Sequence, residues 1–346
     1  MKSVLVITPS ATQLLPTQEL LIAERLRQAG VQTCVLGKAK SRWGRLLEIP
    51  FRSCMLARRY DAVLVNVYGE WAFVYESLAI LYARLWKKRI VVLIRSGLMP
   101  EFVRRRPRWA RLVLSQANLV LVPHGFLQEK LSGLGLRIDG VIPNFIDLKR
   151  YKFRQRSVLA PRFLHLRGMY PYYNPQMAIR AFSLVQNKYP DATLTMAGPE
   201  GEESALCRTL VQDLNLRNVH FLGQVPKEQI PILADRHDIH LHTNRVENMP
   251  VTIIEMWACG LPVVGTEVGG MPYLVHNRID GILIKSEDYQ GMASACLELL
   301  SNSELAGTLS RNGRARAEKL TWENIKPLWE NALLLDGKAI RGNLSS

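Results

Sequence analysis

Short apolar runs alternate with amphipathic stretches along the whole chain of 346 residues. Each apolar run is only a few residues long and is rich in Val, Ile and Leu, as strands buried in a parallel sheet are. The stretches between the runs have the length and the spacing of apolar positions that helices show. Strand and helix therefore alternate from end to end, which predicts α/β architecture with parallel sheets and crossover helices.

These runs locate the predicted elements. In the first half we predict strands at 3–8, 32–36, 62–66, 90–94, 118–122 and 140–142, and helices at 18–29, 43–59, 71–86, 101–115 and 125–132. In the second half we predict strands at 162–166, 192–197, 219–222, 239–242, 262–265 and 281–284. A turn-prone cluster at 143–147, followed by a polar, basic stretch at 148–157, predicts a linker between the halves.

The length of the chain is enough for two domains, each with its own core. We predict one open α/β domain at 1–156 and a second at 157–320. Residues 321–335 would form a helix that crosses back to the first domain, with Pro327 as its kink. The small and polar residues 336–346 are expected to form a frayed tail.

The segment 238–275 carries the most informative chemistry. It reads as a strand, a polar loop, a helix opened by Pro250 and closed by a glycine, and a second strand. Glu247 then lies in the loop at the carboxyl end of the first strand, and Glu255 lies inside the helix. Ligands bind at this end of the strands in open α/β sheets, and the N–H groups at a helix N-terminus are suited to an anion.

Two glutamates at this spacing also occur by chance, and an exposed Glu is usually only part of a solvated surface. Glu255, however, stands among two isoleucines, a methionine and a tryptophan. An ionised carboxylate is costly in such surroundings unless it is paired or hydrogen-bonded. Because a carboxylate accepts two sugar hydroxyls well, the context favours a ligand-binding role for both glutamates.

The two glutamates are followed by Ala258-Cys259-Gly260-Leu261-Pro262-Val263-Val264 and then by Val268-Gly269-Gly270-Met271-Pro272. This succession resembles the Glu-x7-Glu signature, with its usual continuation, of retaining glycosyltransferases of family four. The resemblance extends over most of residues 160–330 and more weakly over the first half. It implies the GT-B fold, in which two Rossmann-like domains of open parallel sheet face one another across a cleft.

By this resemblance, the second half binds a nucleotide sugar. Glu255 would hold the ribose hydroxyls, and Glu247 would hold hydroxyls of the transferred sugar near its anomeric carbon. The sugar or phosphate would approach the backbone at Asn248, Met249, Pro250 and Val251. The family's loop usually reads Glu-Gly-Phe-Gly, whereas this chain reads Glu247-Asn248-Met249-Pro250. Because both glycines are replaced, the backbone of this loop is less free to approach a ligand.

A departing diphosphate gains negative charge and needs a cation nearby. The resemblance implies an Arg and a Lys after the first strand of the second half. Arg167 fills the first position, while the Lys position falls at about Tyr173 or Asn174, so the second cation is missing. Arg95 stands where the family often has a His. It could supply that cation, bind an anionic acceptor, or form a structural ion pair.

Further motifs limit the cofactors. Gly198 follows a strand in a Gly-Pro loop that resembles the nucleotide-facing loop of the family. His240 and His242 stand at strand spacing without the Cys or paired carboxylates of a metal site, which favours structural histidines. The chain lacks an Asp-x-Asp motif and a Gly-x-Gly-x-x-Gly after the first strand. We therefore expect no metal and no bound cofactor, with the nucleotide sugar as a substrate.

Charge is distributed unevenly along the chain, whose formal net charge is +15. Residues 1–156 hold 27 Lys and Arg against 10 acidic residues, while the remainder holds 18 against 20. The basic clusters at 87–89, 104–111 and 149–156, the first two with interleaved aromatics, suit an anionic membrane leaflet or a lipid-phosphate acceptor. An inert basic surface is the main alternative, and nucleic acid is disfavoured because no known nucleic-acid module accompanies the charge.

The remaining composition indicates where the protein acts. Five cysteines without paired spacing fit reduced, buried thiols of a cytoplasmic protein, and the apolar runs are too short to span a bilayer. We predict a metal-independent, retaining glycosyltransferase of polysaccharide biosynthesis that moves a hexose-like sugar to a glycan or lipid-linked acceptor. It would be cytoplasmic, with peripheral attachment to the inner face of the cell membrane. A catalytically silent scaffold and a nucleotide-sugar epimerase are the alternatives.

Overall fold

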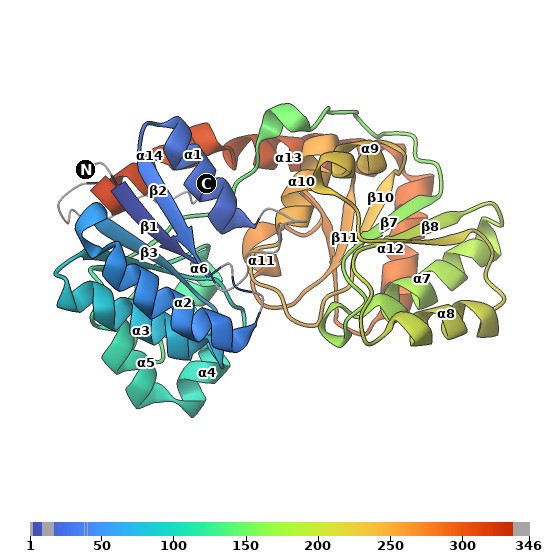
Figure 1. Ribbon diagram of the computed structural model, residues 1–346. Coiled ribbons are helices and arrows are strands. Elements are labelled where there is room, and N and C mark those ends of the chain that lie inside the picture. The colour runs from blue at the N-terminus through green and yellow to red at the C-terminus, as the bar shows by residue number, and fades with distance from the viewer. Residues whose placement is uncertain (1–2, 9–16, 38, 40, 335–346) are drawn as a thin grey trace. The chain divides into compact units, whose positions relative to one another are not determined.

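The computed structural model describes residues 3–8, 17–37, 39 and 41–334 (Figure 1). The chain forms two compact units. The first comprises Met1–Asn144 and Trp322–Ser346, and the second comprises Phe145–Thr321. The division falls inside the turn-prone cluster at 143–147, whereas the sequence placed it at 156. The helix α14 (Trp322–Leu334) belongs to the first unit.

The first unit is built on a parallel six-stranded sheet with the order β2-β1-β3-β4-β5-β6. Its strands are β1 (Ser3–Ile7), β2 (Gln32–Leu36), β3 (Ala62–Val67), β4 (Arg89–Ile94), β5 (Leu119–Val122) and β6 (Gly140–Val141). Besides α14, its helices are α1 (Gln18–Gln28), α2 (Arg42–Met55), η1 (Ala57–Arg59), α3 (Ala72–Leu85), α4 (Met99–Arg105), α5 (Pro107–Leu114) and α6 (Gly125–Ser132). The central strands are buried almost throughout, which explains their continuous apolar runs.

One predicted helix of the first unit is divided in two. The sequence predicted a single helix at 101–115, but α4 ends at Arg105 and α5 starts at Pro107. Proline fits the first turn of a helix, where its missing N–H has no intrahelical partner, but its ring obstructs the turn before it. Pro107 therefore ends one helix and begins the next.

The second unit repeats the plan with the strand order β12-β11-β10-β7-β8-β9, again parallel. Its strands are β7 (Arg162–Leu166), β8 (Thr193–Ala197), β9 (Val219–Gly223), β10 (Ile239–His242), β11 (Val263–Thr266) and β12 (Ile282–Ile284). Its helices are η2 (Leu148–Arg150), η3 (Pro171–Tyr173), α7 (Pro175–Lys188), α8 (Ser204–Asp213), η4 (Lys227–Gln229), α9 (Ile230–Asp235), α10 (Val251–Cys259), α11 (Met271–Leu274), α12 (Tyr289–Ser301) and α13 (Ser303–Lys319). The predicted α/β class, with two Rossmann-like sheets, is confirmed.

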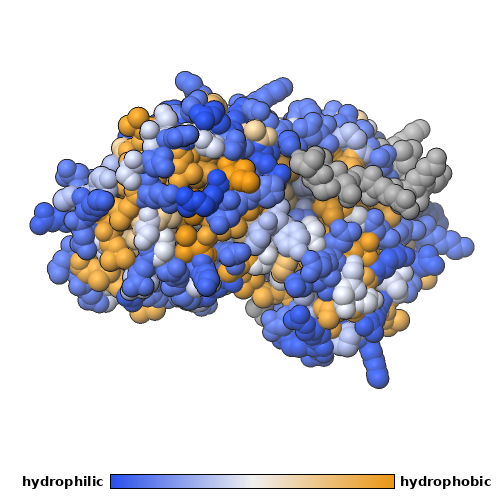
Figure 2. Space-filling view, turned by 180° about the vertical axis from the view of Figure 1, so that it is seen from behind, coloured by the Kyte–Doolittle hydropathy of each residue, from blue (hydrophilic) through white to orange (hydrophobic). Residues whose placement is uncertain are grey.

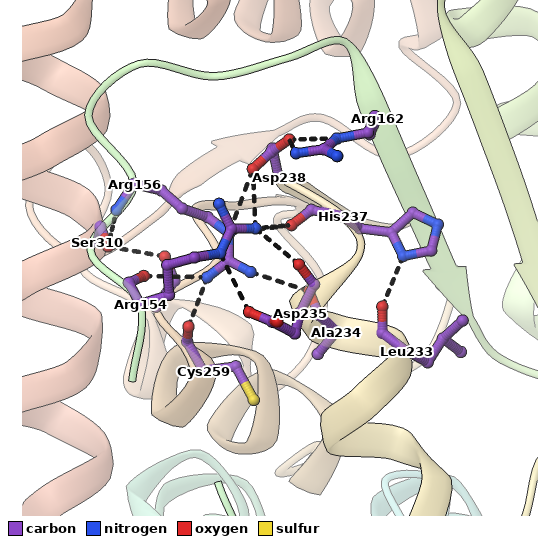
Figure 3. Close-up of polar contacts among 11 residues, drawn as sticks. Arg154, Arg156, Arg162, Leu233, Ala234, Asp235, His237, Asp238, Cys259 and Ser310 are labelled. Carbon is purple, nitrogen blue, oxygen red and sulfur yellow. Dashed lines mark hydrogen bonds and ion pairs between the residues drawn. The ribbon is translucent and has the colours of Figure 1, made fainter. Parts of the chain in front are cut away.

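The stretch 148–157, predicted as a linker, instead packs into the second unit. The side chain of Arg156 is fully buried and donates to the backbone oxygens of Ala234, His237 and Cys259 (Figure 3). Ala234 and Cys259 lie at the carboxyl ends of α9 and α10, where helix carbonyls lack intrahelical partners. One guanidinium thus satisfies the ends of two helices, and its positive charge suits their dipoles.

Asp238 balances this buried charge. Its carboxylate, on a residue that is only 1% exposed, lies 3.5 Å from Arg156 Nε and also pairs with Arg154 at 3.1 Å and Arg162 at 2.7 Å (Figure 3). A buried cation and anion each carry a large desolvation cost that pairing offsets. The basic run was therefore not wholly a solvated surface, because its last arginine is part of the core.

The surface mixes polar and apolar residues, and hydrophobic residues are interspersed among hydrophilic ones on the face in Figure 2. All five cysteines are free thiols. Cys207, Cys259 and Cys296 are buried as expected, but Cys54 is exposed and Cys34 is half-buried, so the expectation of buried thiols fails for the cysteines of the first unit. None of the helices within the described ranges is long and apolar enough to cross a bilayer.

Candidate functional site

The strand order of the second unit places a candidate site between β7 and β10. From β7 the chain adds β8 and β9 on one side, and from β10 it adds β11 and β12 on the other. Neighbouring strands that lead away in opposite directions leave a crevice at their carboxyl ends, where ligands bind in open α/β sheets. Arg167 directly follows β7, and Glu247 lies in the loop after β10.

Arg167 and Glu247 meet at this crevice. Arg167 Nη2 donates to Glu247 Oε2 over 2.6 Å, and both side chains are largely buried. The same oxygen lies 3.0 Å from His242 Nε2 and 2.6 Å from Asn244 Nδ2. Burial alone would raise the pKa of Glu247, but the Arg167 charge and the His242 hydrogen bond outweigh it and lower this pKa to about 2. Glu247 is therefore an anion at neutral pH.

Several buried polar atoms around this pair have no hydrogen-bond partner among the described residues. They are Arg167 Nε, Asn244 Oδ1 and His242 Nδ1. Buried polar groups are nearly always satisfied, so unsatisfied ones grouped around a carboxylate and a guanidinium need an explanation. A polar ligand entering the crevice would supply one.

Two glycines permit the backbone to approach these side chains. A Cβ on Gly198 would stand 2.2 Å from the backbone oxygen of Arg167, and one on Gly269 would stand 2.1 Å from that of Glu247. Both residues have positive φ, +150° and +53°, which L side chains rarely adopt. Gly198, predicted as part of a nucleotide-facing loop, thus packs against the residue predicted to hold phosphate. The Gly-Gly pair after β11 packs against the backbone of the Glu247 loop, and Gly270 N–H donates to the backbone oxygen of Glu247.

Glu255 lies on α10, and its side chain is less exposed to solvent than that of Glu247. It is 2% exposed, and its Oε1 accepts a hydrogen bond of 2.7 Å from the Tyr151 hydroxyl. Lys227 Nζ lies 3.8 Å away. Burial raises the pKa of Glu255 because the Lys227 charge and the Tyr151 hydrogen bond offset the desolvation only in part. The carboxylate is thus paired and hydrogen-bonded, as its apolar surroundings require.

Lys227 and Tyr151 were missed by sequence reasoning. Lys227 belongs to η4, which follows β9, so it comes from the carboxyl edge of the same sheet. That position directly after a strand was a usable signal, although the resemblance pointed to Tyr173 or Asn174 for the second cation and Arg95 was the alternative. Tyr173 itself lies under Arg167, whose guanidinium carbon is 5.1 Å from the ring centroid.

The loop before α10 is tightly held. Asn248 N–H donates to Glu247 Oε1 over 2.9 Å, which orients the carboxylate. Pro250 is the N-cap of α10, Val251 is its first residue, and Asn248 and Met249 are buried. The helix therefore begins at the predicted place, beside the carboxylate of its own preceding loop.

Arg95 lies in the first unit and forms a structural ion pair, one of the three alternatives left open. Arg95 Nε is 3.0 Å from Glu19 Oε1, and both side chains are buried. Its guanidinium also donates to Asn66 and Asn144. Glu19 accepts a further hydrogen bond of 2.7 Å from the Tyr68 hydroxyl. Arg95 therefore joins the carboxyl ends of β3 and β4 to α1.

The three buried histidines of the second sheet have structural contacts. His240 Nδ1 lies 3.0 Å from the backbone oxygen of Leu164, and His165 Nε2 lies 3.1 Å from Thr243 Oγ1. Burial lowers the pKa of each, that of His165 to about 3 and that of His240 well below its usual value. They are neutral at pH 7, and His242 orients Glu247. Within the described ranges no group of three or more His, Cys, Asp or Glu could hold a metal ion.

Solved structures match this arrangement over nearly the whole chain. Anabaena Alr3699/HepE, solved in complex with UDP, superposes with a TM-score of 0.78 over 96% of this chain and 99% of its own, at 19% identity. Sucrose-phosphate synthase from Thermosynechococcus elongatus superposes with a TM-score of 0.76 over 96% and 98%, at 18% identity. The fold is GT-B. At these identities the likeness concerns the fold alone.

Sequence comparison adds to the GT-B assignment. Residues 152–316 match the family described as glycosyl transferases group 1. N-acetyl-alpha-D-glucosaminyl L-malate synthase of Bacillus anthracis is 28% identical over 228 residues, which cover 62% of this chain and 58% of that protein. D-inositol 3-phosphate glycosyltransferase of Paenarthrobacter aurescens (strain TC1) is 26% identical over 255 residues, 67% of this chain and 60% of that protein.

These matches support a place in the GT-B glycosyltransferase superfamily. The aligned region spans less than two thirds of each of these two relatives. The match to the group 1 family lies entirely within the second unit, which holds Arg167, Glu247 and Glu255.

Proposed function

We propose that this protein transfers a sugar from a nucleotide sugar to a glycan or lipid-linked acceptor, with retention of the anomeric configuration. The observation that carries the proposal is the Arg167–Glu247 pair at the carboxyl ends of β7 and β10, with unsatisfied polar atoms around it. The group 1 match and the GT-B relatives, one of them solved with UDP, support the same reading.

Each residue of the site has a role in this proposal. Arg167 stabilises the departing diphosphate, since negative charge grows there as the glycosidic bond breaks. Glu247 accepts hydrogen bonds from hydroxyls of the transferred sugar, and Glu255 accepts them from the ribose. Gly198 and the backbone at Asn248, Met249, Pro250 and Val251 line the approach. Lys227 is the second cation, in place of the Lys expected near Tyr173.

No protein base is assigned, because Glu247 is held as an anion by its own partners and has a low pKa. A phosphate oxygen of the leaving diphosphate would take the proton of the acceptor hydroxyl. The acceptor would then bond to the sugar on the same face from which the diphosphate departs, which retains the configuration. We propose that the reaction needs no metal, since Arg167 and Lys227 provide positive charge for the diphosphate. The protein would act in the cytoplasm.

Nucleoside diphosphate release from a panel of nucleotide sugars tests this function. With acceptor and excess chelator present, the protein should release the nucleoside diphosphate from one nucleotide sugar of the panel. NMR of the product should show that the anomeric configuration is kept. Arg167→Ala should lower the rate by about 10²–10³-fold. Arg180→Ala, an exposed arginine on α7, is the matched control and should leave the rate unchanged.

The alternatives give different results in the same assay. Saturable nucleotide binding without release across the panel would favour a silent scaffold. Rearrangement of the sugar without release would favour an epimerase. Inversion at the anomeric carbon would contradict retention while leaving the transferase intact.

We also propose that the first unit associates with an anionic membrane surface. Helix α2 turns a row of large apolar side chains to solvent at every fourth position: Trp43, Leu47, Phe51 and Met55, each 67–76% exposed. The end of α3, which packs on α2, exposes Leu85 and Trp86 as well. Exposed Arg52 and Arg84 lie in the same two helices, and exposed Arg58 and Arg59 lie in η1, which follows α2. Apolar side chains bordered by cations suit a bilayer rich in anionic lipid.

Sedimentation with vesicles tests this association. Binding should require phosphatidylglycerol, weaken with salt, and fall in Leu47→Ser/Phe51→Ser. Leu206→Ser, an exposed leucine on α8 of the second unit, is the control. Binding that ignores lipid charge, or that the α2 variant keeps in full, would contradict the proposal.

A further inference from the structure

The first unit contains a cavity of about 370 Å³. Its lining includes Glu70 and Trp71 from the loop after β3, Phe102 and Arg105 from α4, Trp109 from α5, and Arg106 between these two helices. These segments follow the carboxyl ends of β3 and β4, and open α/β sheets bind ligands at that edge. The donor-site residues lie in the other unit, so this cavity has no role yet.

Two indole rings give the cavity apolar faces. Trp71 is 74% exposed, an unusual state for the largest apolar side chain. Trp109 is held from behind, with its ring centroid 4.9 Å from that of Phe73 and 5.8 Å from that of Phe102, both in edge-on contact. One ring is therefore fixed and the other is open to solvent. Flat rings of this kind pack against the C–H face of a sugar ring.

The charged groups of the cavity add hydrogen bonding and a positive balance. Arg105 Nη2 pairs with Glu70 and also lies 3.7 Å from Glu101 Oε1. Arg106 is exposed beside it, and Arg104 and Arg108 extend the same run. A carboxylate next to a guanidinium can accept from and donate to adjacent sugar hydroxyls. The excess of guanidinium groups favours a ligand that also carries a negative group.

The loop that carries Glu70 and Trp71 is held in a costly conformation. Glu70 has a φ of +52°, a region that non-glycine residues rarely occupy, and it follows Gly69 at +82°. The fully buried Glu76 accepts hydrogen bonds from the N–H groups of Tyr68 at 3.0 Å and Gly69 at 3.4 Å. Such strain persists where the surroundings enforce it, and it concentrates at binding sites. The cavity wall is therefore formed before any ligand arrives.

We propose that this cavity binds a negatively charged sugar residue of the acceptor glycan. The sugar ring packs on Trp71 and Trp109, the Glu70–Arg105 pair binds its hydroxyls, and Arg106 binds its carboxylate, phosphate or sulfate group. The assignment to the acceptor rests on the proposed transferase function. The binding of an anionic sugar rests on the cavity alone.

An array of immobilised oligosaccharides, carboxylated, phosphorylated, sulfated and uncharged, tests the site with the full chain. The protein should bind a subset of the anionic glycans and none of the uncharged ones. Trp71→Ala and Arg106→Gln should each weaken that binding at least about tenfold. Leu112→Ala is the matched control, since Leu112 is 66% exposed on α5 and does not line the cavity. Melting curves and UDP affinity establish that each variant is folded.

The other outcomes overturn the proposal. Binding to none of the glycans, equal binding of charged and uncharged glycans, or equal effects of Trp71→Ala and Leu112→Ala would each do so. The proposal would also be overturned if Trp71→Ala and Arg106→Gln lost binding to phosphatidylglycerol vesicles but kept glycan binding. The ligand of the cavity would then be a lipid headgroup. Glycan binding without nucleoside diphosphate release from any nucleotide sugar of the panel would remove the transferase and keep the site.

Discussion

Arg167 donates a hydrogen bond of 2.6 Å to Glu247, so the cation proposed for the leaving diphosphate is already paired with the carboxylate proposed for the sugar. A bound donor must therefore share the guanidinium with Glu247. Arg167 is forked and has a second edge, whose Nε is buried without a partner among the described residues. The pair thus positions the cation while leaving one edge for a phosphate.

This arrangement predicts different effects on binding and on turnover for Glu247→Gln. The neutral amide no longer offsets the Arg167 charge, so UDP affinity should stay the same or increase. Transfer should fall by about 10²-fold, since the sugar loses an anionic partner that acts at the reacting centre. Calorimetry with UDP and the release assay measure the two quantities. An equal loss in both would mean that Glu247 supports the fold of the site and does not bind the sugar.

Glu255→Gln should act mainly on nucleotide binding. The amide is close to the same size and can still accept from the Tyr151 hydroxyl, so the fold should survive. A ribose that loses its charged acceptor should bind about tenfold more weakly or worse. Affinity for UDP, compared with that of Glu267→Gln as an exposed control on the same unit, measures the effect. Unchanged affinity would contradict the ribose assignment.

Arg156→Met should destabilise the second unit strongly. It removes the one fully buried partner of Asp238. It also removes the side-chain donor to the carbonyls of Ala234 and Cys259, which keep only backbone donors. Removing one member of a buried pair costs about 3–5 kcal/mol. Arg162→Met removes a partner of the same carboxylate, but its side chain is 46% exposed, so the loss should be about 1 kcal/mol or less. Urea unfolding of both variants should separate them clearly, and equal losses would contradict the role given to Arg156.

Glu76 should make stability depend on pH. Burial raises its pKa to about 8, against 4.5 for an ordinary glutamate, although two backbone N–H groups oppose the shift. A raised pKa means that the folded state binds the proton more tightly. The resulting stabilisation is complete below pH 4.5 and is lost as the pH rises through 8. Glu76→Gln should lack that decline. Melting temperatures between pH 5 and 9, with exposed Glu24→Gln as control, test this, and parallel profiles for all three proteins would refute it.

Much of the fold could be predicted because most of the strands are buried. β7 and β10 have the predicted bounds, and all their residues except Arg162 are buried. The placement of Glu247 and Glu255 followed from the same pattern, because a strand–loop–helix unit determines which edge of the sheet each one reaches. Neither required knowledge of distant contacts.

The pairing of charged residues whose partners lie far away in the sequence could not be predicted. Lys227 reaches Glu255, and Arg95 reaches Glu19, only after the sheets have formed. Arg156 stands in a run that looks exposed, and nothing local shows that two helix ends and Asp238 surround it. Local pattern therefore located the elements, whereas the pairing of buried charges required the tertiary structure.

The burial of Arg156 has a practical consequence for anyone who wishes to produce the second unit by itself. A fragment that starts at 157, the boundary that sequence suggests, would lack both Arg156 and the Tyr151 hydroxyl that holds Glu255. It would lack the guanidinium that donates to the carbonyls of Ala234 and Cys259, and Asp238 would keep only Arg162 of its three arginine partners. A fragment that starts at Phe145 keeps these groups and is the one to express for crystallisation or for titration with UDP.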